Sequence, residues 1–109
     1  MKHFEFLLPT HRNDRRSYET QRKLWEVFAM KEAGGLTTCP FVQGLWIGPE
    51  GRTYNDTRVP YRVAGSDDIA AKLLAKAFDL FDDQQSIFLA EIGSAVCHVR
   101  APVEMPKAA

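Results

Sequence analysis

The stretch GGLTTCPFVQGLWIGPEGRTYND, residues 34–56, decides the fold that this chain can adopt. Its two glycines follow an amphipathic helical pattern and supply a left-handed stop for that helix. Two strand-like runs come next, at 37–47 and 52–63, and the tetrapeptide GPEG at 48–51 separates them. Proline at the second position favours a type I turn, because its ring fixes φ near the required value. The stretch therefore predicts a helix followed by a β-hairpin.

Upstream, the alternation of apolar and polar residues predicts a first strand at 3–8, which Pro9 ends. A polar loop leads to Ser17, which we expect to cap a helix running to Ala33. The buried stripe of this helix is expected to consist of side chains that recur at helical spacing. Its members are Tyr18, Gln21, Leu24, Trp25, Phe28 and Ala29.

Downstream, Ser66 and two aspartates predict the start of the second helix, since serine caps helices and acids favour the first turn. The expected apolar stripe is Ile69, Ala70, Leu73, Leu74, Ala77, Phe78 and Phe81. After this helix we expect a strand at 86–92, a tight turn at Gly93–Ser94 and a short extra strand at 95–100. Residues 101–109, with two prolines, are predicted to be a flexible tail.

The order of these elements is β-α-β-β-α-β with an extra C-terminal strand. It predicts an α+β fold, a ferredoxin-like two-layer sandwich with two helices on one face of an antiparallel sheet. The 109 residues suit one domain, which we place at 1–100. Pro40 and Pro60 lack a backbone donor, so we expect Pro40 at a sheet edge or bulge and Pro60 at an exposed edge.

The composition is that of an ordinary globular protein, with 45% hydrophobic and 26% charged residues and a formal net charge of zero. Such a balance disfavours nucleic acid as a partner, because no overall field attracts phosphate. No signal-peptide core and no run of about 20 apolar residues is visible, so no membrane association is expected. Cys39 and Cys97 have no paired spacing, which predicts free thiols in a reducing cytoplasm, with a disulfide as the alternative.

The predicted strands are apolar on both faces, although two helices cover only one face of such a sheet. Phe41-Val42, Leu45-Trp46-Ile47 and Ile87–Ala90 show this most clearly. A wet face should alternate polar with apolar residues. We therefore predict a homo-oligomer, a dimer or trimer, that covers the bare face. The alternative is that the terminal hairpin folds back over this face.

The loop before the first helix is rich in cations. Topology places this loop, the hairpin tip at 48–51 and the connection at 82–85 at one end of the molecule. Arg12, Arg15 and Arg16 lie there beside a helix N-terminus, which predicts a site for a small anion such as a phosphate or carboxylate. The alternative interpretation is that Arg15 and Arg16 pair with Asp82 and Asp83 or are only solvated.

The hairpin supplies a second candidate ligand site. Trp46, Tyr54 and Asp56 are expected to share the sheet face that points away from the helices, with Arg52 nearby. An aromatic plane beside a carboxylate and a guanidinium suits a nucleoside, since the base stacks and the carboxylate accepts hydrogen bonds. Packing between subunits is the alternative, because Trp, Tyr and Arg are enriched at interfaces.

Glu91 lies within an apolar strand, where loss of solvent would raise its proton affinity and suit it to acid–base catalysis. The alternative is a salt bridge at a strand edge. The histidines and cysteines show no zinc-ligand spacing, and no phosphate-binding or dinucleotide glycine motif is present, so neither a metal nor a cofactor is expected.

The segments LLPT at 7–10, GGLTTCP at 34–40, GLWIGPEGRTYND at 44–56 and FDDQQSIFLAEIG at 81–93 resemble a family of small uncharacterised ferredoxin-like proteins of phages and plasmids. The order of elements also bears a distant resemblance to the phage S-adenosylmethionine lyases, whose trimers bind their substrate between subunits. That resemblance implies a lyase, with Tyr54 and Glu91 standing in for the tyrosine and glutamate of that family, which have no direct counterpart here.

Three functions follow as hypotheses. The first is a homo-oligomeric module of a mobile element that binds a small anionic or nucleotide-derived ligand between subunits. The second is a small enzyme that acts on an adenosine-containing metabolite, as the lyases do. The third is an interaction protein that docks a host partner on the bare sheet face.

Overall fold

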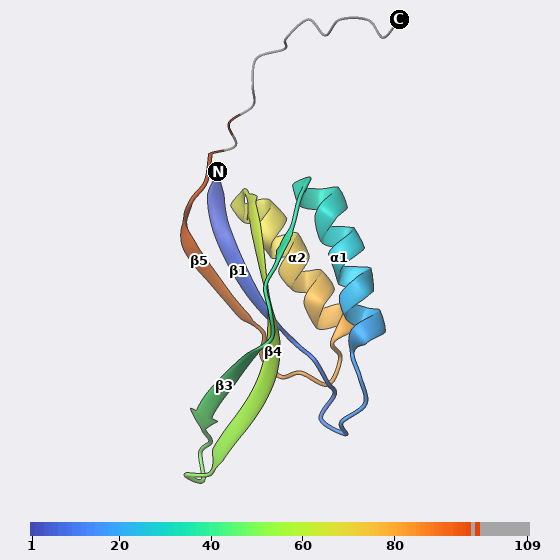
Figure 1. Ribbon diagram of the computed structural model, residues 1–109, viewed down its shortest axis with the longest axis vertical. Helices are drawn as coiled ribbons and strands as arrows, with labels where there is room; N and C mark the ends of the chain where they lie inside the picture. The colour runs from blue at the N-terminus through green and yellow to red at the C-terminus, as the bar shows by residue number, and fades with distance from the viewer. Residues whose placement is uncertain (97, 99–109) are drawn as a thin grey trace, which may run out of the picture.

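The computed structural model describes residues 1–96 and 98, and within them two helices cover one face of a five-stranded antiparallel sheet (Figure 1). The strand order is β2-β4-β1-β5, and β3 also pairs with β4. The predicted α+β fold, a ferredoxin-like sandwich, is confirmed. The elements are β1 Lys2–Pro9, α1 Glu19–Ala33, β2 Thr37–Thr38, β3 Val42–Ile47, β4 Thr53–Gly65, α2 Asp67–Leu80 and β5 Phe88–Ser94.

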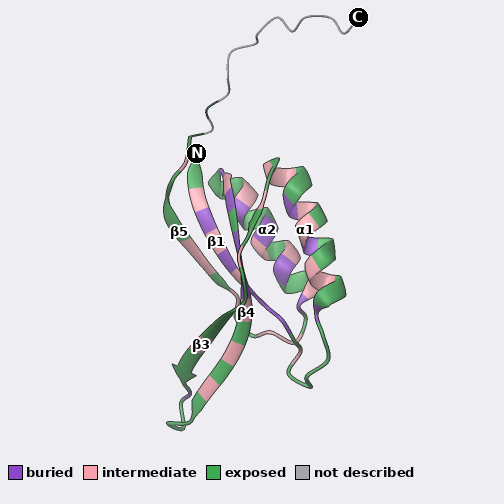
Figure 2. Ribbon diagram, viewed as in Figure 1, coloured by how far each residue is buried: buried purple, intermediate pink, exposed green. Residues whose placement is uncertain are grey.

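The core lies between the sheet and the helices, where Figure 2 places most of the buried residues. Period-two alternation directs one face of β1 and β4 inward. Trp25 of α1 is fully buried between the rings of Phe6 and Tyr61, at centroid distances of 5.2 and 5.1 Å. Its Nε1 donates to the carbonyl oxygen of Leu73 at 3.0 Å, which joins α1 to α2. This indole therefore connects both helices to the sheet.

Two residues that were expected in the buried stripes are exposed. Leu24 keeps 53% of its surface in solvent and Phe78 keeps 41%. Each lies roughly 100° around its helix from a buried neighbour, Trp25 or Ala77. The stripe that each helix presents to the sheet is therefore narrower than the apolar pattern in the sequence.

The helix termini follow the predicted chemistry with one shift. Gly34 has φ +80° and ends α1 by donating its N–H to the Met30 carbonyl. Ser66 caps α2 through a hydrogen bond from the Ile69 backbone N–H. The first helix begins one residue later than predicted, with Tyr18 at the cap position and its N–H bonded to the carbonyl of Thr10. Ser17 still accepts a hydrogen bond from the Glu19 backbone N–H at 3.0 Å, as the predicted cap requires.

The predicted strand at 37–47 is divided into β2 and β3. The interruption includes Pro40, where a sheet edge or bulge was expected. The expectation that Pro60 lies at an exposed edge is wrong, because β4 is a central strand and Pro60 is buried. The Pro60 carbonyl accepts from the Cys39 N–H, so its nitrogen also faces the break between β2 and β3. No ladder hydrogen bond is required there, and proline is tolerated.

The tight turn predicted at Gly93–Ser94 is also wrong. β5 continues through both residues and pairs with β1 as far as Lys2↔Ser94. Gly93, at φ +140°, sits beside a register shift opposite His3 and Phe4, so it accommodates a bulge rather than a reversal. Residues 95, 96 and 98 form no strand, and the other half of the predicted extra strand and the whole tail at 101–109 lie outside the described residues.

The hairpin of β3 and the first half of β4, residues 42–57, is here called the arm. β1 pairs with β4 only from Gly65 to Arg58, whereas β3 pairs with β4 from Arg58 to Thr53. The arm therefore projects past the ends of the helices (Figure 1). At its tip the Gly51 N–H donates to the Gly48 carbonyl, which closes the predicted turn at 48–51.

We expect Trp25→Phe to lower the free energy of unfolding by about 2–3 kcal/mol, because it leaves a void and removes the bond to Leu73. Chemical denaturation followed by far-UV circular dichroism measures this change. Leu24→Ala, at the neighbouring exposed position, should change the stability by less than about 0.5 kcal/mol. Equal losses in the two variants would contradict the central place of Trp25.

Candidate functional site

A large hollow lies between the arm and two loops of the body. It measures about 600 Å³ and is here called the main groove. Its lining comes from residues 9–13, Arg15, residues 54–58 and Gln84. The predicted meeting of the 9–17 loop with the 82–85 connection is thus confirmed. The hairpin tip, however, lies at the far end of the arm, so residues 54–58 take its place.

Asp83 holds the two loops together. Its carboxylate accepts from the Asn13 backbone N–H at 2.6 Å, from the Tyr18 hydroxyl and from the Gln84 amide at 3.0 Å. The Asn13 side-chain amide donates back to the Asp83 carbonyl at 3.0 Å. We call these contacts the loop clasp. They fix the position of the cationic loop relative to the end of α2.

The loop clasp changes the acidity of its members. Partial burial by itself raises the pKa of Asp83, but hydrogen bonds from Tyr18, Asn13 and Gln84, with the nearby charge of Arg12, lower it to about 2. Burial, followed by the bond to Asp83, raises the pKa of Tyr18 to about 12. The clasp is therefore closed, with an ionised carboxylate and a neutral phenol, throughout the neutral pH range.

The three arginines of the loop have different environments. Arg12 lies 5.1 Å from the centre of the Tyr18 ring and pairs with Asp82 at 2.9 Å. Arg16 pairs with Asp14 at 2.6 Å. Within residues 1–96 and 98, Arg15 has no carboxylate partner, and its φ of +72° is unusual for a residue with a side chain.

These environments decide between the two interpretations of the loop. Asp82 and Asp83 do not pair with Arg15 or Arg16, because Arg12 and the loop clasp occupy them. Arg15 lines the main groove, whereas Arg16 does not. The anion-binding capacity of the loop is thus concentrated in one guanidinium.

The predicted cluster on the arm forms as expected. The rings of Trp46 and Tyr54 stack with centroids 4.4 Å apart and planes inclined by 16°. Trp46 Nε1 donates to Asp56 Oδ2 at 3.1 Å, and Arg58 Nη2 donates to the same oxygen at 3.1 Å. All four residues lie on the outer face, the sheet face away from the helices, because their spacing is two along each strand.

Sequence reasoning missed Arg58, although the spacing of two from Asp56 places both on one face. Arg52, which was expected in this cluster, lies at the exposed tip and does not line the main groove. The Tyr54 hydroxyl donates to Glu50 at 2.6 Å, and this bond raises the pKa of Tyr54. The Tyr54 hydroxyl therefore points toward the hairpin tip at 48–51.

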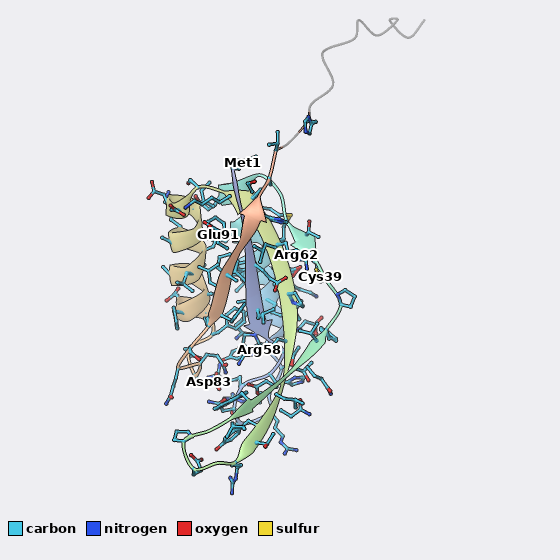
Figure 3. All side chains as sticks on the ribbon, turned by 90° about the vertical axis from the view of Figure 1, so that its left-hand side faces the viewer. Met1, Cys39, Arg58, Arg62, Asp83 and Glu91 are labelled. Atoms are coloured by element: carbon cyan, nitrogen blue, oxygen red, sulfur yellow. The ribbon has the colours of Figure 1, made fainter. Side chains whose placement is uncertain are left out.

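Glu91 lies elsewhere. It pairs with Lys2 at 3.1 Å, Lys2 also contacts Asp67 at 3.0 Å, and half of the Glu91 side chain is exposed. This is the strand-edge salt bridge of the alternative interpretation. Figure 3 shows Glu91 near Met1, whereas Arg58 and Asp83 lie at the opposite end of the body. Tyr54 and Glu91 therefore do not form one catalytic centre.

The arm carries large exposed apolar side chains on both faces. Leu45 and Ile47 are 71% and 73% exposed, and by alternation they point away from the face of Trp46. On the body, Phe88 is 53% exposed on the outer face. The outer face is less apolar than predicted, however, because Glu5 and Arg62 form an ion pair across it at 3.0 Å. One group of exposed apolar side chains therefore lies on and beside the arm, and a second group, Leu24, Val27, Met30 and Phe78, lies on the helices.

Two further observations concern the described part of the chain. None of its helices is long and apolar enough to cross a membrane. Residues 1–96 and 98 contain no group of three or more His, Cys, Asp or Glu side chains that could hold a metal ion. Cys39 is a half-buried free thiol, and its partner in the alternative disulfide, Cys97, lies outside the described residues.

Comparison with models of known protein families gave no match, and neither did comparison with the sequences of curated proteins. The chemistry of the main groove and the arm therefore carries the functional argument.

The pKa of Asp83 predicts an acid-sensitive contribution to stability. Its folded value of about 2 lies below the usual 3.8, so the stabilisation is complete above about pH 4 and is lost as the pH falls toward 2. We expect Asp83→Asn to be less stable than the parent at pH 7 and the difference to shrink below pH 4. Thermal unfolding at a series of pH values measures it. Asp79→Asn, on an exposed carboxylate, is the control, and a difference that stays constant with pH would contradict the assignment.

Proposed function

We propose that this protein is a homo-oligomeric module that binds a small anionic, nucleotide-derived ligand in the main groove, between subunits. The observation that carries the proposal is that one groove of about 600 Å³ is lined by Arg15, by the Asp56–Arg58 pair and by Tyr54. A cation, a polar pair and an aromatic ring are the groups that a nucleotide requires.

The anionic part of the ligand is assigned to Arg15. The other two arginines of the loop already have carboxylate partners, so an anion there would compete with Asp82 or Asp14. A guanidinium without a carboxylate partner in the described residues binds a phosphate or carboxylate through two parallel hydrogen bonds. The loop clasp supports this role, because it holds the loop in one conformation before the ligand arrives.

The oligomeric part of the proposal rests on the arm. A two-stranded hairpin is only marginally stable in water unless a third strand or another layer packs on it. Residues 53–57 of β4 pair only with β3, and both arm faces expose large apolar side chains. The face of Leu45 and Ile47 is completed by Thr53, Asn55 and Thr57 and carries no charge, so a second copy meets it without like-charge repulsion.

Binding of nucleotides tests the ligand. We expect nucleoside phosphates to raise the midpoint of thermal unfolding, since a ligand that binds only the native state stabilises it. Arg15→Gln should weaken the affinity for a nucleoside monophosphate about tenfold in titration calorimetry, because it removes charge-assisted hydrogen bonds. Arg16→Gln, on the guanidinium already paired with Asp14, is the matched control.

The outcomes separate the hypotheses. Equal affinities of the Arg15→Gln and Arg16→Gln variants for the nucleoside monophosphate would contradict the assignment of the anion to Arg15. If no member of a panel of nucleotides and S-adenosylmethionine stabilises the protein, the proposed nucleotide-derived ligand class is contradicted. Chromatography of the panel after incubation shows whether any member is consumed, which would convert the module into an enzyme.

The mass of the protein in solution tests the assembly. Light scattering coupled to size exclusion should give two or three times the 12.3 kDa of one chain. Ile47→Glu should dissociate the assembly, because it places a carboxylate in a dehydrated apolar contact. Val27→Glu, at an exposed apolar position of α1, should leave the mass unchanged.

A monomeric parent protein would contradict the assembly and favour a second candidate function. In that case the exposed side chains of Leu45, Ile47 and Phe88 support docking of a different protein on the arm and the outer face.

A further inference from the structure

A second, smaller hollow lies on the outer face, at the base of the arm. It measures about 300 Å³ and is here called the Trp46 pocket. Its lining includes Leu7, Gly44, Trp46, Arg58 and Phe88. It is more apolar than the main groove, and Tyr54 does not line it.

Trp46 lines this pocket, and about half of its surface is exposed. One of its ring faces is covered by Tyr54, its direct partner across the ladder. The Tyr54 ring also packs against Gly48, where an added Cβ would lie 2.6 Å from its Cε2 atom. The Trp46 N–H donates to Asp56, two ladder pairs nearer the body. Tyr54 accounts for one face of the indole, and no other ring of the described residues stacks on Trp46.

Gly44 keeps the space beside Trp46 open. It lies two residues before Trp46 on the same face of β3, where any side chain would project into the pocket. A Cβ built there would meet only the Asp56 carbonyl oxygen, at 3.9 Å. The backbone therefore does not require a glycine at this position, and the absence of a side chain leaves room for a planar group against the indole.

One polar atom faces the same space. Asp56 Oδ2 accepts from both Trp46 and Arg58, and Oδ1 accepts no hydrogen bond from residues 1–96 and 98. A carboxylate oxygen accepts hydrogen bonds only, so it favours a ring edge that carries an N–H or an amine. An aromatic ring gains affinity by stacking on a tryptophan, as nucleobases do on aromatic side chains.

We propose that the Trp46 pocket is the ring subsite of the ligand and takes an amino-substituted aromatic heterocycle stacked on Trp46 over Gly44, with its amine directed at Asp56. This assignment rests on the proposed nucleotide ligand and adds the position and the edge chemistry of the ring. Asp56 and Arg58 line both hollows, so a single ligand reaches from the ring subsite to Arg15.

Gly44 then determines which ligands fit. Gly44→Val fills the ring subsite with a side chain that favours strands, so the hairpin is retained. Leu45→Val is the matched control, because it places the same side chain one residue away on the opposite face of the arm, at a position that lines neither hollow. Far-UV circular dichroism and thermal unfolding verify that both variants fold as the parent does.

Adenosine and purine riboside are the probes, since they differ only in the amine and carry no phosphate. Trp46 is half exposed and Trp25 is fully buried, so quenching of tryptophan fluorescence by the probe reports Trp46, and Trp46→Phe removes the signal. We expect adenosine to bind about fivefold to tenfold more tightly than purine riboside. We expect Gly44→Val to weaken the affinity for adenosine at least tenfold and Leu45→Val to have no effect on it.

The phosphate-free probes make the two proposals separable. If nucleotides bind through Arg15 and Gly44→Val binds them as the parent does, the ring subsite is overturned and the proposed function stands. If adenosine binds and Gly44→Val abolishes it while Arg15→Gln has no effect on nucleotides, the ring subsite stands and the anion assignment is overturned. If adenosine and purine riboside bind equally, the role of Asp56 is overturned. If neither nucleosides nor nucleotides bind, both proposals are overturned.

Discussion

The length of β4 is the constraint on which the other features of this molecule depend. It has 13 residues, whereas β1, its neighbour in the body, has eight. Pairing with β1 therefore ends at Arg58, and residues 53–57 have only β3 as a partner. The residues of β4 that do not pair with β1 form the arm together with β3, and the arm extends away from the helices. Both hollows and the exposed apolar side chains of the arm follow from this mismatch.

The mismatch also explains the position of Asp56 and Arg58. Both lie where β4 extends beyond its pairing with β1. They line the main groove together with residues of the 9–15 loop, and they also line the Trp46 pocket on the outer face. Their ion pair at 3.1 Å is half-exposed on the carboxylate side, with 43% of the Asp56 side chain in solvent and 18% of that of Arg58. The loop clasp completes the wall of the main groove from the side of the body.

Several elements were predictable because their signals are local. The cap at Ser66, the stop at Gly34 and the turn at 48–51 each depend on backbone conformations that a few residues dictate. The shared face of Trp46, Tyr54 and Asp56 followed from strand alternation and the hairpin register alone. The same rule applied one step further would have included Arg58.

The errors involve residues whose environment is set by distant parts of the chain. Pro60 was expected at an edge, but the break between β2 and β3 removed the need for its missing donor. Gly93 was expected in a turn, but the register of β5 against β1 used it as a bulge. Glu91 was considered as an acid or base, and Lys2, far away in sequence, pairs with it at the sheet edge.

The sequence by itself determined the order of the elements, the inner face of the strands and the aromatic face of the hairpin, because periodicity and turn chemistry act over a few residues. Only the tertiary structure decided which arginine of the 9–17 loop lacks a carboxylate partner among the described residues, where the two hollows lie and how far the arm projects. These features depend on which carboxylates meet which cations and on where strand pairing ends. Both are set by contacts between segments far apart in the chain, such as Asn13 and Asp83, which are 70 residues apart.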